Sequence, residues 1–218
     1  TLKGGAGITL ERNGTNGQII LITNTGLNRV GQSTLTIREN ADELGSVNLQ
    51  SMKMFINDPA WVASNTTNGI LPVWMMNNTR NTFLRYNADT GLMNAAFTKT
   101  GTGAAFLATL TPTDIAQYTA GDATLTVAVD TYALRVNHEA ASNDTIISGS
   151  GQINILSGGL IVDNRDNARV QINTALYFGD GSTPVEGIIH ADENTTLLGG
   201  VVTANGLTLD GPGSIQLT

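Results

Sequence analysis

The feature that most constrains the fold of this 218-residue chain is the recurrence of apolar residues in short alternating runs. Leu35 and Ile37 show the pattern, since each is flanked by threonine or arginine. Gly, Asn or Asp residues bound most of the runs, which is typical of short strands joined by turns. Similar runs contain Leu125/Val127/Val129, Leu134/Val136, Ile153/Ile155, Leu160/Val162, Val170/Ile172, Leu207/Leu209 and Ile215/Leu217.

The alternation predicts a nearly all-β chain, because no segment of a dozen residues has a convincing 3.6-residue apolar period. The three-residue step from Val129 to Tyr132 predicts a corner at Asp130–Thr131. One helical turn is predicted at Thr113–Tyr118, with Thr113 as its cap. The 30 Thr residues suit the outward faces of strands, and the 25 Gly and 22 Asn suit the corners between them.

A Gly-x-Gly motif followed by alternating apolar residues recurs along the chain. It occurs at Gly149–Ile155 and Gly211–Leu217, with a looser copy at Gly5–Leu10. Imperfect repetition of this kind favours a solenoid, in which coils of roughly 20 to 25 residues bury their apolar faces against one another. We therefore predict a right-handed parallel β-helix over residues 1–218, as a single domain of a longer secreted protein. The alternative is a Greek-key β-sandwich.

Residues 50–120 interrupt this rhythm, since all five Met and both Trp occur there. We predict an irregular excursion within the β-helical domain. One interpretation is a binding surface, because aromatic and Met side chains are enriched in interfaces. The other is that the excursion packs over the β-helix and fills a small core of its own. The contact surface predicted by the first interpretation consists of Trp61, Trp74, Met75, Met76 and Tyr86.

Charge and composition exclude several classes of function. The chain has 11 basic and 18 acidic residues, a net charge of −7, which does not favour nucleic acid or an anionic membrane surface. It has no cysteine, which excludes a disulfide scaffold, a thiolate zinc site and a cysteine nucleophile. No apolar run approaches the roughly 18 residues of a membrane span. We therefore expect no cofactor, no metal, no nucleic-acid partner and no membrane insertion by this chain.

The candidates for chemistry are few. His138 and His190 are predicted to be surface residues near turns, because neither belongs to a catalytic or metal-binding motif. One cluster between two apolar runs combines acidic and basic residues, as carbohydrate-active β-helices do on one parallel sheet. It consists of Asp163, Arg165, Asp166 and Arg169. The alternative interpretation of this cluster is a solvated turn with weak local ion pairs.

Six segments follow one another in a characteristic order: Leu71–Trp74, Thr82–Leu92, Asp130–Val136, Ile155–Ile161, Glu186–His190 and Asn205–Leu217. In these motifs, over about two-thirds of its length, the chain resembles the autotransporter-associated β-strand repeat proteins. It departs from their Leu-Thr-Lys-x-Gly unit, where Leu209 or Asp210 takes the place of the lysine. The resemblance implies a right-handed β-helical stalk, exported to the bacterial cell surface, and it implies no catalytic residues.

These observations predict a non-catalytic structural or adhesive module, a stalk or filament subunit at the cell surface or outside the cell. Its expected partners are further copies of itself, associated head to tail, and a host or environmental surface. The alternative from a different class is a polysaccharide lyase or hydrolase that uses the acidic cluster.

Overall fold

The computed structural model describes residues 1–11, 19–39, 43–46, 52–138, 144–164 and 169–218. Strands make up 58% of the chain and helices 6%, so the all-β prediction is confirmed. The chain divides into two compact units, unit 1 at Thr1–Ala95 and unit 2 at Ala96–Thr218. The boundary falls within the predicted excursion at 50–120. Within the described residues, no helix is long and apolar enough to cross a membrane.

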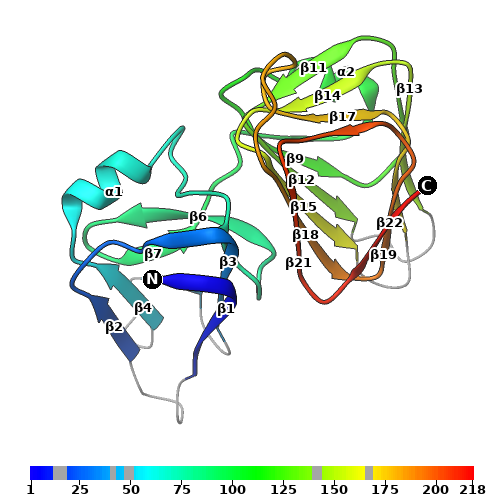
Figure 1. Cartoon of the computed structure of the whole chain (residues 1–218). Coiled ribbons are helices and arrows are strands. Elements are labelled where there is room, and N and C mark those ends of the chain that lie inside the picture. Colours follow the sequence, from blue (N-terminus) through cyan, green and yellow to red (C-terminus); the bar gives the residue numbers. More distant parts are fainter. Residues whose placement is uncertain (12–18, 40–42, 47–51, 139–143, 165–168) are drawn as a thin grey trace. The chain divides into compact units, whose positions relative to one another are not determined.

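Unit 1 contains seven strands and one short helix in the described residues (Figure 1). A sheet of order β1-β3-β5-β6-β7 begins with parallel pairs and ends in two antiparallel ones, and β2 pairs with β4 in a separate parallel sheet. The elements are β1 (Leu2–Leu10), β2 (Ile19–Thr23), β3 (Arg29–Glu39), β4 (Met52–Ile56), α1 (Pro59–Asn65), β5 (Met75–Asn77), β6 (Thr82–Asn87) and β7 (Gly91–Asn94).

Unit 2 is built from three parallel sheets (Figure 1). Most strands pair with the strand three positions later in the chain, so each sheet takes one strand from each successive set of three. The sheets have the orders β10-β13-β16-β19-β22, β11-β14-β17-β20 and β21-β18-β15-β12-β9-β8. We call the last of these the long sheet.

The elements of unit 2 are short, as the spacing of apolar runs predicted. They are β8 (Lys99–Gly101), α2 (Gly103–Leu107), β9 (Ile115–Thr119), β10 (Ala123–Leu125), β11 (Ala128–Thr131), β12 (Ala133–His138), β13 (Thr145–Gly149), β14 (Gln152–Ile155), β15 (Gly159–Asn164), β16 (Val170–Ile172), β17 (Ala175–Phe178), β18 (Gly187–Glu193), β19 (Thr195–Leu198), β20 (Val202–Thr203), β21 (Leu207–Asp210) and β22 (Ser214–Leu217). Every strand pair of unit 2 in the described residues is parallel, whereas a Greek-key sandwich is built from antiparallel strands.

Apolar side chains of unit 2 stack in register into ladders that fill its core. The clearest ladder runs Ala123–Ile147–Ile172–Leu198–Leu217 through five strands of one sheet. Its first four members are buried, with Leu198 1% exposed, whereas Leu217 on the outermost strand is 59% exposed. Leu217 lies on β22, which pairs on one side only within the described residues, whereas α2 packs against β10 at the other edge of the sheet, where Ala123 is buried.

The corners between strands differ partly from the sequence prediction. The predicted continuous strand through Leu125, Val127 and Val129 is interrupted, since β10 ends at Leu125 and β11 begins at Ala128. Val127 points outward at this corner and is exposed. The corner predicted at Asp130–Thr131 is wrong, because both residues belong to β11 and the chain turns at Tyr132 instead.

The two Gly-x-Gly motifs of unit 2 have the same local geometry, although one joins β13 to β14 and the other joins β21 to β22. Gly149 and Gly211 have positive φ values of 113° and 98°, and a Cβ at either would overlap a carbonyl oxygen of the preceding set of strands. The second glycine of each motif, Gly151 or Gly213, donates its N–H to that same carbonyl at 2.9 Å. The looser copy is different, because Gly5 and Gly7 lie inside β1.

Helix α2 and the hydrogen-bonded carboxylate of Asp114 lie at one end of the unit 2 core. Leu107 of α2 is buried in this core, and α2 packs against β10. Asp114 ties the chain around it: its carboxylate accepts hydrogen bonds from Thr98 Oγ1 (2.9 Å) and from Thr111 N (2.8 Å) and Oγ1 (2.7 Å), and pairs with Lys99 Nζ at 3.0 Å. The helical turn predicted at Thr113–Tyr118 is wrong, because β9 occupies most of it and pairs with β12.

We predict that Leu198→Ala destabilises the protein by about 2–5 kcal/mol, because it leaves a cavity in a closed ladder. The matched change Leu217→Ala, at the exposed end of the same ladder, should cost less than about 1 kcal/mol. Chemical denaturation of both variants measures the difference. Equal losses would contradict the stacking of this ladder.

We predict that Asp114→Asn destabilises unit 2, by roughly 1.5–3 kcal/mol near neutral pH, because hydrogen bonds to a charged group are lost. Burial by itself raises the pKa of Asp114, but the hydrogen bonds from Thr111, Lys99 and Thr98 outweigh it and lower the pKa to about 2. A lowered pKa stabilises the folded state above the ordinary value of 3.8, and this contribution is lost as the pH falls towards 2.

The gap in unfolding free energy between the native protein and this variant should therefore narrow between about pH 4 and pH 2. Acid-dependent denaturation of both proteins measures it, and Asp89→Asn, at an exposed aspartate of unit 1, is the control. A gap that stays constant over this range would mean that the Asp114 charge does not stabilise the fold.

Candidate functional sites

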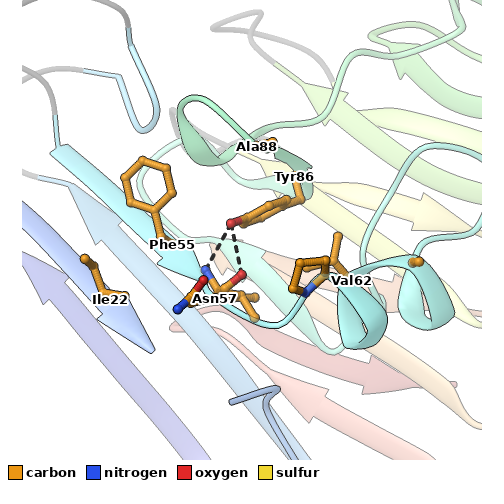
Figure 2. A pocket seen from close by; sticks show the side chains of 9 residues that line it. Ile22, Phe55, Asn57, Val62, Tyr86 and Ala88 are labelled. Carbon is orange, nitrogen blue, oxygen red and sulfur yellow. Dashed lines mark hydrogen bonds between the residues drawn. The ribbon is translucent and has the colours of Figure 1, made fainter. Parts of the chain in front are cut away.

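Unit 1 contains an apolar pocket of about 630 Å³ (Figure 2). Strands β2 and β4, helix α1 and the turn between β6 and β7 supply its walls. In Figure 2, Ile22 and Phe55 lie on one side of the pocket and Val62 of α1 on the other. The lining residues are Ile22, Phe55, Ile56, Asn57, Pro59, Val62, Ala63, Tyr86 and Ala88.

The start of α1 positions one wall of this pocket. Asp58 caps the helix, since its Oδ1 accepts a hydrogen bond from Trp61 N at 3.0 Å, and Pro59 occupies the first helical turn. The other oxygen of the Asp58 carboxylate accepts a hydrogen bond from Gly26 N at 3.1 Å. A Cβ at Gly26 would overlap the Trp61 ring, so the loop after β2 packs closely against α1.

Tyr86 forms an aromatic wall whose orientation is set by hydrogen bonds. Its hydroxyl donates to Ile56 O at 3.0 Å and accepts from Ile56 N at 3.2 Å (Figure 2). Both hydrogen bonds link β6 to the end of β4, where the chain leaves the sheet towards α1. Among the described residues that line the pocket, none is charged, and the Asn57 amide offers both a donor and an acceptor. Such a pocket suits an apolar or aromatic group.

The structure separates the five residues of the predicted contact surface. Tyr86 lines the pocket, whereas Trp61 and Trp74 are half-buried against the unit 1 core. Met75 and Met76 on β5 are buried and therefore do not contribute to a surface. Sequence reasoning missed Ile22 and Phe55. The sequence did offer a signal for Ile22. The run Ile19–Thr23 has apolar residues on both faces of the strand, and only one face is needed to cover a core, so the other face is left to form an apolar surface.

The second candidate site is a polar network on the long sheet of unit 2. Arg135 forms an ion pair with Asp163 and donates hydrogen bonds to Gln117 Oε1 at 3.0 Å and Asn137 Oδ1 at 3.3 Å. Its guanidinium carbon also lies 5.7 Å from the centre of the Phe97 ring. The network therefore joins β9, β12 and β15 through one arginine.

Three further polar residues, on β18 and β21, lie beside this network on the same sheet. Asp163 lies opposite Asp192 of β18, and His190 lies opposite Asp210 of β21. The His190 Nδ1 atom is 3.4 Å from Asp210 Oδ2. The exposed fraction is 0% for Asp163, 1% for His190 and 8% for Asp192, so a polymeric substrate does not reach these groups in this conformation.

The acidic cluster predicted at 163–169 is not assembled as one site in the described residues. Asp163 is buried in β15, and Arg169 is exposed and donates its backbone N–H to Asp144 Oδ1 at 3.0 Å. Arg165 and Asp166 lie outside the described residues. Among the described residues, Asp163 forms an ion pair with Arg135 of β12, which lies 28 positions earlier in the chain.

The prediction of two surface histidines is wrong, because His138 and His190 are each 1% exposed. His138 Nδ1 lies 2.7 Å from Thr145 Oγ1, a hydrogen bond that joins β12 to β13. Over the part of the chain that the structure describes, no three His, Asp or Glu side chains come together as a metal site.

Comparison of the chain with protein-family models, with curated proteins and with solved structures found no match in any of the three.

Proposed function

We propose that this protein is a non-catalytic structural or adhesive module, exported by a bacterium and displayed at the cell surface or outside the cell. In this proposal unit 2 is a right-handed parallel β-helix, and unit 1 supplies a contact site through its apolar pocket. The proposed exported location and family follow the sequence resemblance to autotransporter-associated β-strand repeat proteins.

The observation that carries the proposal is the regular pairing of unit 2. Partner residues in its sheets are between 17 positions apart (Lys99 and Ala116) and 29 positions apart (Gly159 and Ile188), around the predicted coil length. A chain that returns to the same sheet in parallel after each set of three strands is what a β-helix requires. The right hand is favoured because crossover connections between parallel strands are right-handed in about 98% of cases.

A structural role also agrees with where the polar residues of unit 2 lie. Arg135, which is 9% exposed, holds adjacent strands of the long sheet together through its bonds to Gln117 and Asp163. The pocket of unit 1 has the opposite character, since it is open and apolar. This division supports a scaffold in unit 2 and a contact function in unit 1.

The exported location is tested on intact cells that produce the protein. A membrane-impermeant amine reagent should label Lys3, which is exposed on β1, without lysis of the cells. A cytoplasmic enzyme of the same cells, which should stay unlabelled until lysis, is the control. Labelling of this protein only after lysis would refute the proposed location.

The enzymatic alternative is tested with polyuronates as substrates. We predict no release of reducing ends or unsaturated products by the native protein. The variant Asp163→Asn should instead lower the free energy of unfolding by about 3–5 kcal/mol, because it leaves the Arg135 charge buried without its carboxylate partner. Asp122→Asn, at an exposed aspartate of the same unit, is the control. Product release that Asp163→Asn abolishes in a still-folded protein would favour the alternative.

A further inference from the structure

The walls of the apolar pocket in unit 1 are held in place by contacts within the protein. The Asp58 cap and the close packing of Gly26 on Trp61 fix the α1 wall. Two hydrogen bonds to the backbone of Ile56 fix Tyr86. The volume of about 630 Å³ lies within the range of small-molecule sites, roughly 300–1,000 Å³. A preformed pocket of this size binds a small organic molecule at little cost in conformational ordering.

The charges around this pocket disfavour a charged ligand. Lys53, Asp58 and Asp89 are close in sequence to lining residues, but none of the three lines the pocket. Both carboxylate oxygens of Asp58 accept hydrogen bonds from backbone N–H groups. Lys53 lies opposite Ile20, two positions along β4 from Phe55. A charged ligand would therefore lose hydration in the pocket without gaining an opposite charge, and this is costly.

Two aromatic rings of the pocket are available to contact a third ring. Phe55 comes from β4 and Tyr86 from β6, and both point into the pocket in Figure 2. The two rings do not stack on each other in the described structure. Aromatic rings attract a further ring in offset-stacked or edge-to-face arrangements. The pocket therefore fits an aromatic ligand better than an aliphatic one.

Asn57 supplies the polar contact of the pocket. The Tyr86 hydroxyl and the backbone groups of Ile56 bind one another, and the backbone N–H of Asn57 donates to Thr23 O at 2.7 Å. The side-chain amide of Asn57 lines the pocket and makes no hydrogen bond to another described residue. Because an amide both donates and accepts, it can bind one polar group of a ligand.

We propose that the unit 1 pocket binds a small, uncharged aromatic molecule with a single hydrogen-bonding group. The ring packs between Phe55 and Tyr86, and the polar group reaches the Asn57 amide. This inference rests on the contact function proposed for unit 1 and names the class of ligand. Burial of the apolar surface of the ligand supplies most of the affinity, and Asn57 fixes its orientation.

Binding of the fluorescent probe N-phenyl-1-naphthylamine to the full chain tests the proposal. This probe is uncharged and aromatic, carries a single N–H group, and fluoresces more strongly when it leaves water. It should bind saturably, one molecule per chain. The anion 8-anilinonaphthalene-1-sulfonate has the same ring skeleton and should bind about tenfold more weakly or worse. A native chain that binds neither probe, or both equally, would overturn the proposal.

Filling the pocket tests where the probe binds. Ala63→Trp adds a large side chain to the pocket lining and should weaken binding of the uncharged probe by about tenfold or more. Ser64→Trp, at the next exposed position of α1 but outside the lining, is the matched control and should bind as the native chain does. Circular dichroism verifies that both variants fold. Unchanged binding by Ala63→Trp would place the probe elsewhere and contradict the proposed site.

A second ligand tests the contact with Asn57. In 1-benzylnaphthalene a methylene group replaces the N–H group of the probe, so this compound should bind the native chain about two- to tenfold more weakly than the probe. Asn57→Leu should bind both compounds equally. A preference for the N–H compound that persists in this variant would refute the role of Asn57. Each of these failures would leave the proposed exported location standing, since surface labelling tests it separately.

Discussion

Parallel, in-register pairing of each strand with the strand three positions later is the constraint on which unit 2 depends. It stacks residues of equivalent position directly above one another, so the inward rows are largely apolar. The row of Val170 also contains two buried threonines, Thr145 and Thr196. It also brings successive corners into close contact. The Gly-x-Gly corners at Gly149 and Gly211 meet this requirement, because any side chain there would overlap the carbonyl of the preceding set of strands.

The same register explains the polar network of the long sheet. The register places Asn137, Asp163 and Asp192 opposite one another on three adjacent strands. Arg135, two residues before Asn137 on the same strand, reaches Asp163 diagonally and forms an ion pair with it. A buried ion pair contributes little net stability, but removing one partner is costly. Arg135 therefore penalises any register that separates it from Asp163, and we interpret the network as a device that specifies strand alignment.

Unit 1 pairs differently, since its parallel pairs join strands two positions apart, and its apolar pocket lies where this parallel pairing ends. The chain leaves β4 at Ile56, enters α1 through the Asp58 cap and returns in the β6–β7 hairpin. Tyr86 bridges this departure by binding both backbone groups of Ile56. The segment from Ile56 to the β6–β7 hairpin thus leaves an apolar pocket beside β2 and β4. A regular stack of strands would have filled this space.

The sequence by itself determined the all-β class, the short strands, the length of the repeat and the Gly-x-Gly corners, because alternation and glycine spacing are local properties. It did not determine the break at Val127, whose alternation continues across a corner, or the burial of His138 and His190. Nor did it identify Arg135 as an ion-pair partner of Asp163, because the two residues lie 28 positions apart in the chain. Only the tertiary structure decided these features, since the register joins residues more than twenty positions apart and burial depends on what lies across a strand.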